Sequence, residues 1–195
     1  YNGVATISKL PPEEIRLGLY EGDDEQARFL SVKVLNIPVI NVYVPQGFSP
    51  GTEKFLYKLD WLEDLLSHIK RKYDPGLPLL IAGDFNVALG PIDLYDPEGL
   101  RGEAGFHPDE QAAMRKIFEW GIVDIFREYH PKGGHYTFWD YRIPNGFKRN
   151  MGWRIDYILA TRPLAEKSKK AWIDTEPRIR EKPSDHTFLV AEFDI

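Results

Sequence analysis

The 195-residue sequence contains no cysteine. This absence excludes disulfide bonds and thiolate metal sites, and it is typical of proteins in a reducing interior, so we expect a cytoplasmic location. Any metal ion must be held by Asp, Glu, Asn or His, a donor set that favours a hard cation such as Mg²⁺ or Mn²⁺.

Long apolar runs are absent as well. No stretch approaches the roughly 20 apolar residues of a membrane-spanning helix, so we expect no membrane partner. The opening residues YNGVATISK carry neither a basic region nor a long apolar stretch, so we also expect no signal peptide. The length and the 43% hydrophobic content fit one globular domain over residues 1–195.

A surplus of positive charge is missing too, because 25 Lys and Arg stand against 30 Asp and Glu. The net negative charge of such a protein gives it no overall electrostatic attraction to nucleic acid. The basic residues are nevertheless clustered, at 70–72, 148–154, 167–170 and 178–182. Such clusters are often solvated faces, but basic rims around an acidic centre also suit a phosphate-rich partner.

Apolar patterning predicts several short strands. They are Val4–Lys9, Phe29–Leu35, Val39–Val44, Leu79–Ala82, Tyr136–Trp139, Arg154–Thr161, Lys170–Asp174 and Thr187–Phe193. Residues 36–38 are expected to join the second and third strands tightly, and Glu13, Glu14 and Glu21 are expected in polar loops.

Two helices are predicted between these strands. The apolar stripe of the first consists of Phe55, Leu59, Leu62, Leu66 and Ile69. The second begins at Pro108, with acids in its first turn, and closes near Gly121. The Gly- and Pro-rich loop 90–106 is long enough to indicate a function. This order of elements favours an α/β layered fold over an all-β barrel.

Polar side chains gather where predicted strands end. In LLIAGDFNVA, a buried strand runs into Asp84 and Asn86, which leave on the same side because side chains alternate along a strand. Tyr43, Asp156 and the pair 185–186 lie near other strand ends. Each has an ordinary explanation, such as a turn former or a partner for a nearby arginine. Five separate coincidences would be needed, so the pattern favours one shared site.

Several segments together resemble the exonuclease III class of apurinic/apyrimidinic (AP) endonucleases, within the endonuclease/exonuclease/phosphatase superfamily. They are NVYVPQG, LLIAGDFNVA, AGFHPDEQ, YTFWDYR, GWRIDYILA and PSDHTFLVAEF. The resemblance covers nearly the whole chain. It implies a DNase I-like, four-layered α/β sandwich, in which two packed mixed β-sheets are flanked by helices.

The resemblance implies catalytic roles for five residues. Asp84 resembles the carboxylate that orients or deprotonates the attacking water, and Asn86 its neighbour that holds water or phosphate. Tyr43 resembles the tyrosine at the scissile phosphate. Asp156 resembles the carboxylate that orients the His186 imidazole toward a phosphate oxygen.

The resemblance also implies metal and substrate contacts. Asp185 resembles a metal-site carboxylate, with Mg²⁺ or Mn²⁺ as the cofactor. The implied substrate-binding residues are Gln46, Gly47, Phe138, Trp153 and Ile155. The last three would line a pocket for a baseless sugar rotated out of the helix, where a normal base pair does not fit. Core packing remains the alternative for Phe138 and Trp153.

These residue types suit phosphodiester hydrolysis, because a cation and a histidine can carry the charge of the transition state and a carboxylate can take a proton from water. We therefore expect double-stranded DNA with abasic sites as the partner, cut on the 5′ side of the site. A 3′–5′ exonuclease or 3′-phosphodiesterase activity would be a further activity. A non-catalytic DNA-binding fragment and a phosphatase of small phosphoesters stay open.

The opening strands of the family, which bring its principal metal-binding glutamate, match no segment here, and YNGVATISK resembles an interior strand. We therefore expect a fold that is incomplete at the N-terminus, with an uncovered sheet edge. We also expect a monomer, or a chain complemented by a missing N-terminal segment.

Overall fold

The structure is a computed structural model that describes residues 3–20 and 26–195. Its elements are β1 (Glu13–Leu17), β2 (Phe29–Val34), β3 (Ile37–Tyr43), α1 (Glu53–Lys72), β4 (Leu80–Asp84), η1 (Pro91–Asp93), α2 (Pro108–Glu119), β5 (Ile122–Asp124), α3 (Ile125–Tyr129), β6 (Asp156–Thr161), α4 (Arg162–Ala165), β7 (Ser168–Asp174), η2 (Glu176–Ile179) and β8 (Phe188–Phe193). The loop expected at Glu21 lies outside the described residues.

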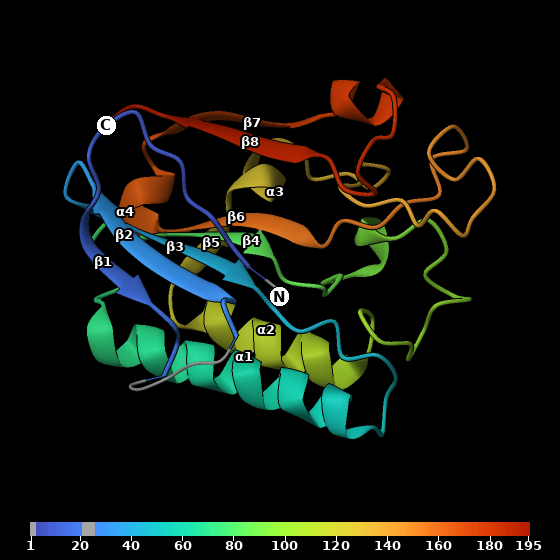
Figure 1. The fold of residues 1–195 in the computed structure, drawn as a ribbon, viewed down its shortest axis with the longest axis horizontal. Coiled ribbons are helices and arrows are strands. Elements are labelled where there is room, and N and C mark those ends of the chain that lie inside the picture. Colours follow the sequence, from blue (N-terminus) through green and yellow to red (C-terminus); the bar gives the residue numbers. More distant parts are fainter. Residues whose placement is uncertain (1–2, 21–25) are drawn as a thin grey trace.

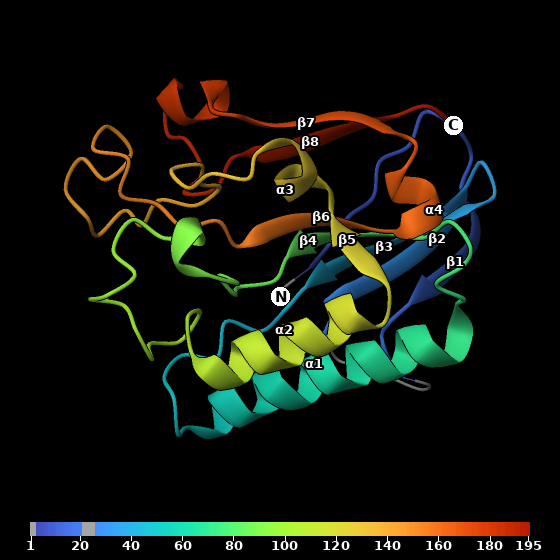
Figure 2. The same cartoon turned by 180° about the vertical axis from the view of Figure 1, so that it is seen from behind.

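A six-stranded mixed sheet forms the centre of the molecule, in the order β1-β2-β3-β4-β6-β5. Helices α1 and α2 lie side by side on one face, and a two-stranded antiparallel sheet, β7-β8, lies over the other (Figure 1, Figure 2). The expected α/β class, with two sheets and flanking helices, is confirmed. The described residues supply three of the four expected layers, because no described α-helix covers the outer face of β7-β8 (Figure 1).

Apolar burial holds these layers together. The inner stripe of α1, including the buried Trp61 and Leu65, packs with Ile40 and Ile81 of the central sheet. A second cluster joins the two sheets and is made of Val123, Ile125, Phe126, Ala160, Leu164, Ala165 and Ala171. Each fully buried Leu or Ile stabilises the fold by about 1.5–3 kcal/mol relative to its exposed state. No helix of the described residues is long and apolar enough to cross a membrane.

The parallel pair β3 and β4 sets the functional end of the sheet. Helix α1 connects these two strands, and its N-cap Thr52 accepts a hydrogen bond from the Phe55 N–H. Since both strands run in the same direction, their last residues meet at one edge of the sheet. The long loops that follow them lie at the same end of the molecule (Figure 1).

Both helices and most strands are confirmed within one or two residues of the predicted bounds, but three predictions were wrong. Residues 4–9 form no ladder with a described strand, and residues 136–139 make only isolated bridges through Phe138. Glu13 and Glu14, expected in a loop, begin the edge strand β1. The short elements β5, α3 and α4 had no predicted counterpart.

The β2–β3 hairpin turns earlier than predicted. Leu35 and Asn36 have φ values of 52° and 62°, and Val34 pairs with Ile37. A two-residue loop with positive φ at both positions is a type I′ turn, whose twist matches that of the flanking strands. Ile37 and Pro38 therefore belong to β3 and not to the connection.

Candidate active site

Three neighbouring strands bring Tyr43, Asp84 and Asp156 to one edge of the central sheet. Tyr43, the last residue of β3, is in register with Asp84, the last residue of β4. Asp84 is in turn opposite Asp156, the first residue of the antiparallel strand β6. The structure thus brings these predicted site residues together, although they are far apart in the sequence.

Gly83 makes the close approach of β3 and β4 possible. Its φ is +141°, and a Cβ atom at this position would lie 1.9 Å from the carbonyl oxygen of Val42. A side chain would therefore collide with the neighbouring backbone. The glycine of the GDFN motif is thus required to present Asp84 beside Tyr43.

Asn86 fixes the carboxylate of Asp84. Its φ of 53° lies in the left-handed region, which Asn tolerates better than most residues. Its N–H donates to Oδ1 of Asp84 at 2.8 Å, and its Nδ2 donates to Oδ2 of Asp84 at 3.1 Å and to the Val44 carbonyl oxygen at 3.0 Å. The side chain that stabilises the turn therefore also orients the acid.

His186 reaches the same site from the loop before β8. Its Nδ1 donates to Oδ2 of Asp156 at 2.9 Å, and its Nε2 lies 4.0 Å from Oδ2 of Asp84. Burial by itself would lower the pKa of His186, but the hydrogen bond and charge of Asp156, together with Asp84 and Asp185, raise this pKa to about 9. The imidazole is therefore protonated at neutral pH.

Burial raises the pKa of Asp84 to about 7, and the charge of Asp156 acts in the same direction. His186, the Asn86 N–H and Lys58 oppose this rise. Two close, partly desolvated carboxylates attract either a proton or a cation. Asp84 therefore changes its protonation state near neutral pH.

The same residues suit a divalent cation. Among the described residues, Asp84, Asp156 and His186 form a group whose candidate ligand atoms lie within 4.8 Å of one another. A protonated His186 offers no lone pair, so at neutral pH the carboxylates are the available ligands of this group. Carboxylate oxygens are ligands of hard cations such as Mg²⁺ and Mn²⁺. A cation would also relieve the repulsion that raises the pKa of Asp84, so the residues present fit such an ion. Asp185, the predicted metal residue, lines the cavity nearby but is not a member of this group.

A cavity of about 760 Å³ lies in front of these groups. The predicted site residues that line it are Tyr43, Gln46, Asp84, Asn86, Phe138, Trp153, Ile155, Asp185 and His186. Asp156 is not among the lining residues, since it is hydrogen-bonded to the inner nitrogen of His186. Gly47 is also not among the lining residues, and the substrate contact expected of it stays a prediction. With φ of +88° and a Cβ position 2.9 Å from the Lys58 side chain, Gly47 shapes the loop.

One wall of the cavity is apolar. Phe138 and Trp153 are bridged through their backbones, and the Phe138 ring centroid lies 4.9 Å from that of His186. Both aromatic residues are half-buried against a small cluster that contains Phe106 and Ile155. The two aromatic residues thus pack against a small core and also line the cavity, and their contact with a sugar stays a prediction.

Some cavity residues were not found by sequence reasoning, namely Phe48, Tyr95, Gly99, Leu100, Glu103, Ala104, Gly105, Asp140, Arg142 and Ile143. Six of them lie in loop 90–106, whose composition indicated a function without showing which side chains face inward. Asp140 and Arg142 follow Phe138 in the next loop, and the hydrogen bonds from Arg142 lower the pKa of Asp140. No spacing in the sequence marked this pair.

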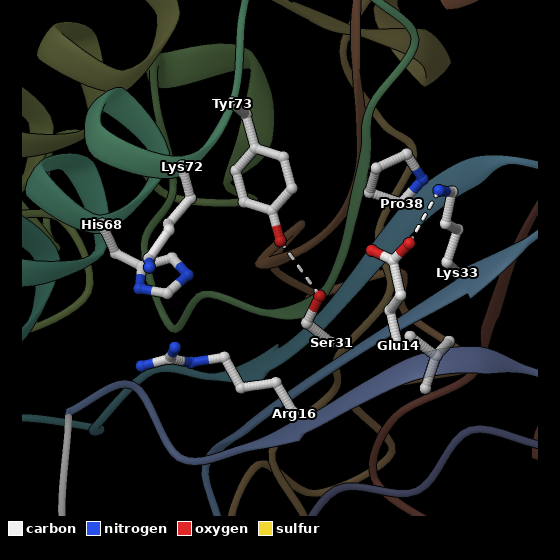
Figure 3. A pocket seen from close by; sticks show the side chains of 9 residues that line it. Glu14, Arg16, Ser31, Lys33, Pro38, His68, Lys72 and Tyr73 are labelled. Atoms are coloured by element: carbon white, nitrogen blue, oxygen red, sulfur yellow. Dashed lines mark hydrogen bonds and ion pairs between the residues drawn. The ribbon is translucent and has the colours of Figure 1, made fainter.

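A smaller cavity of about 210 Å³ lies near the C-terminal end of α1 (Figure 3). Its one carboxylate, Glu14, pairs with Lys33 at 2.8 Å, and the Tyr73 hydroxyl lies 3.1 Å from Oγ of Ser31. It has no second acid to form a metal site.

Comparison with known proteins agrees with this geometry. The model of the Endonuclease/Exonuclease/phosphatase family matches residues 1–186. The exodeoxyribonuclease of Bacillus subtilis is 36% identical over 178 residues, which are 90% of this chain and 69% of that protein. Exodeoxyribonuclease III of Haemophilus influenzae is 34% identical over 204 residues, covering 98% of this chain and 76% of that protein.

Solved structures show the same similarity. An AP endonuclease from Archaeoglobus fulgidus has a TM-score of 0.91 at 44% identity, covering 95% of this chain and 72% of that chain. The 3′ phosphatase NExo from Neisseria, bound to a product DNA hairpin, has a TM-score of 0.90 at 34% identity, covering 96% and 73%. The predicted resemblance is therefore confirmed, and this chain belongs to the Endonuclease/Exonuclease/phosphatase family, where it is similar to exonuclease III and AP endonuclease enzymes.

Proposed function

We propose that this protein is a metal-dependent DNA-repair phosphodiesterase that cuts double-stranded DNA on the 5′ side of an abasic site. One observation carries the proposal: a single cavity joins the polar group around Asp84 and His186 to the apolar wall of Phe138, Trp153 and Ile155. The first can act on a phosphate, and the second can hold a compact sugar that has no base. The names of the similar AP endonucleases support this substrate.

Asp84 is suited to take a proton from the attacking water. The pKa of about 7 applies to the site without a cation, and a bound cation would lower it, so that Asp84 is ionised at neutral pH and can accept a proton from water. The hydrogen bonds from Asn86 hold both oxygens of Asp84 in one orientation. In this proposal Asn86 therefore positions the base and contributes a polar edge to the phosphate site.

His186 is suited to stabilise the phosphate in the transition state. Its outer nitrogen, Nε2, is directed toward the Asp84 side of the cavity, while Nδ1 is bound to Asp156. A protonated imidazole held in this way can donate to a phosphate oxygen as negative charge develops there. Tyr43 lines the cavity beside Asp84 and is proposed to contact the same phosphate.

We propose Mg²⁺, or Mn²⁺, as the cofactor. Because Asp156 is bound to His186, the cavity-lining carboxylates Asp84 and Asp185 would hold the ion from the cavity side. When bound, such an ion supplies positive charge that stabilises the phosphoryl oxygens.

A second activity on DNA ends, removal of a 3′ phosphate or a 3′ nucleotide, is favoured by the similarity to the Neisseria 3′ phosphatase. The same polar group would act on the phosphate in that reaction. A 3′-phosphorylated hairpin measures this activity separately from cleavage at an abasic site.

The site assignment is tested with Asp84→Asn and His186→Ala on an abasic duplex with Mg²⁺. We expect each substitution to lower kcat by about 10²–10⁴-fold, the range for a positioned acid, base or charge-stabilising group. Asp174→Asn and His135→Ala are matched controls, because neither residue lines the cavity. Wild-type rates in both site variants would contradict the assignment.

A further inference from the structure

Behind the cavity, a pair of buried charges joins the two long helices. Lys58 of α1 forms an ion pair with Oε1 of Glu110 of α2, and both side chains are fully buried at 0% exposure. Helices α1 and α2 lie side by side in both views (Figure 1, Figure 2). Desolvation makes a buried ion pair a weak source of stability, and well-packed apolar residues often serve as well or better. The attraction between the two charges is therefore a weak reason for this pair, and its other hydrogen bonds matter more.

The remaining hydrogen bonds of Lys58 go to the backbone of two cavity segments. Its Nζ donates to the Asn86 carbonyl oxygen at 2.7 Å and to the Gln46 carbonyl oxygen at 3.2 Å. Asn86 in turn holds both oxygens of Asp84 through its N–H and its side chain. Lys58 is thus separated from the proposed base by one residue.

Glu110 anchors a third cavity segment. Its Oε2 accepts the N–H of Gly105 at 2.8 Å and the N–H of His107 at 3.1 Å. Gly105 lines the cavity and is tightly packed, since a Cβ atom there would lie 3.0 Å from the Trp153 ring and 3.3 Å from the Asn86 carbonyl oxygen. The end of loop 90–106 is therefore fixed between Glu110 and the apolar wall.

We propose that Lys58 and Glu110 are positioning residues, which fasten the Gln46, Asn86 and Gly105 segments to one rigid helix pair. An ammonium group has three donors and a carboxylate has two acceptor oxygens, so the pair satisfies itself and four backbone groups at once. Apolar side chains of similar size would fill the space and satisfy none of them. The pair thereby sets the distance between the phosphate site and the sugar wall.

The kinetic part of this inference rests on the proposed function, whereas its structural part does not. The variant Lys58→Met/Glu110→Leu removes both charges and keeps an apolar filling, so we expect it to fold cooperatively. The hydrogen-exchange rates of the Gly105 and His107 backbone amides are expected to rise at least tenfold over their wild-type values. On an abasic duplex, kcat is expected to fall about 10-fold to 100-fold with a smaller rise in KM, because misplacing catalytic groups by about 1 Å has effects of this size.

Two further variants keep the test decisive. Thr161→Val is the matched control, because Thr161 is fully buried at the far end of β6 and bonds the 77–79 backbone. It is expected to lower the melting temperature while kcat, KM and exchange at Gly105 stay at wild-type values. If the double variant does not fold, Glu110→Gln keeps the shape and one acceptor oxygen, and we expect smaller changes in the same direction.

Wild-type exchange at Gly105 and His107, together with unchanged kcat and KM in the folded double variant, would overturn the proposal. An inactive wild-type protein would instead contradict the proposed function, and the exchange measurement would still decide the role of the ion pair.

Discussion

Asp84 and Asn86 owe their positions to two unusual backbone conformations. Gly83 adopts φ of +141° against the Val42 carbonyl, and Asn86 adopts φ of 53° to direct its amide back to Asp84. The sequence showed which residue types leave the strand. It could not show that the Asn86 side chain both stabilises the turn and orients Asp84, because this depends on where the fold places the Val44 carbonyl oxygen.

Gly83→Ala is expected to destabilise the protein by more than about 2 kcal/mol, because strain at such a φ is of order 1–3 kcal/mol and a backbone collision adds to it. Cleavage activity should fall as well, since Asp84 moves with its neighbour. Urea denaturation gives the free energy of unfolding. Gly90→Ala is the control, because Gly90 has an extended φ and open space around it, and a change within about 0.5 kcal/mol is expected there. Equal stability of the two variants would contradict this account of Gly83.

The pH dependence of stability follows from the two raised pKa values. The folded state holds the protons of His186 and Asp84 more tightly than the unfolded state, in which the pKa values are about 6.5 and about 3.9. The stabilisation from His186 is therefore complete below about pH 6.5 and is lost as the pH rises through about 9. That from protonated Asp84 is lost between about pH 4 and 7.

In the presence of a chelator, the free energy of unfolding is accordingly expected to fall between pH 5 and 9. The fall should be smaller in Asp84→Asn below about pH 7 and smaller in His186→Ala between about pH 7 and 9. Urea titrations at each pH measure these curves. A wild-type curve that rises over this interval, with both variants parallel to it, would contradict the derived charge states.

At the scale of elements, apolar patterning predicted what local sequence controls. The α1 stripe and the strand at Leu80–Asp84 were found because each buries a continuous apolar face. The prediction failed where pairing depends on distant chain segments, as at 4–9 and 136–139. Type I′ geometry at Leu35 was missed because leucine rarely adopts positive φ.

The β2–β3 turn therefore offers a stabilising substitution. Leu35→Asn/Asn36→Gly places the preferred residues at both positive-φ positions, and we expect the free energy of unfolding to rise by about 0.5–1 kcal/mol. Leu35 is 58% exposed, so little apolar contact is lost. Urea denaturation checks the gain. The single substitution Leu35→Gly, which leaves the order Gly-Asn at the turn, should give a smaller gain in the free energy of unfolding. A loss of stability in the double variant would contradict the turn assignment.

At the scale of the whole molecule, the cavity is acidic and so is the protein, with a net charge of -5. Asp84, Glu103, Asp140 and Asp185 line the cavity together with the cationic Arg142 and His186. The acids outnumber the cationic side chains, so a DNA phosphate meets net negative charge there unless a cation is bound. The sequence predicted two of these four acids, Asp84 and Asp185, from strand-end motifs. It could not predict Glu103 or Asp140, because their direction depends on how two long loops fold over the sheet.

Affinity for an abasic duplex is therefore expected to rise at least tenfold when Ca²⁺, a hard cation that permits binding measurements, is added to chelator-treated protein. Asp84→Asn/Asp185→Asn should bind DNA more tightly than wild type without the cation and should gain less from it. Fluorescence anisotropy with a labelled duplex gives both affinities. A wild-type affinity that is independent of the cation would contradict a shared metal and phosphate site.

The central claim is that one cavity cuts the backbone beside a sugar that has no base. The most direct measurement uses two 5′-labelled duplexes that differ only in a single abasic site, incubated with the protein and Mg²⁺. The account predicts one product that ends at the nucleotide on the 5′ side of the abasic site, and an intact control duplex at the same time point. Equal cutting of both duplexes, or no cutting of either at any divalent cation concentration, would contradict it.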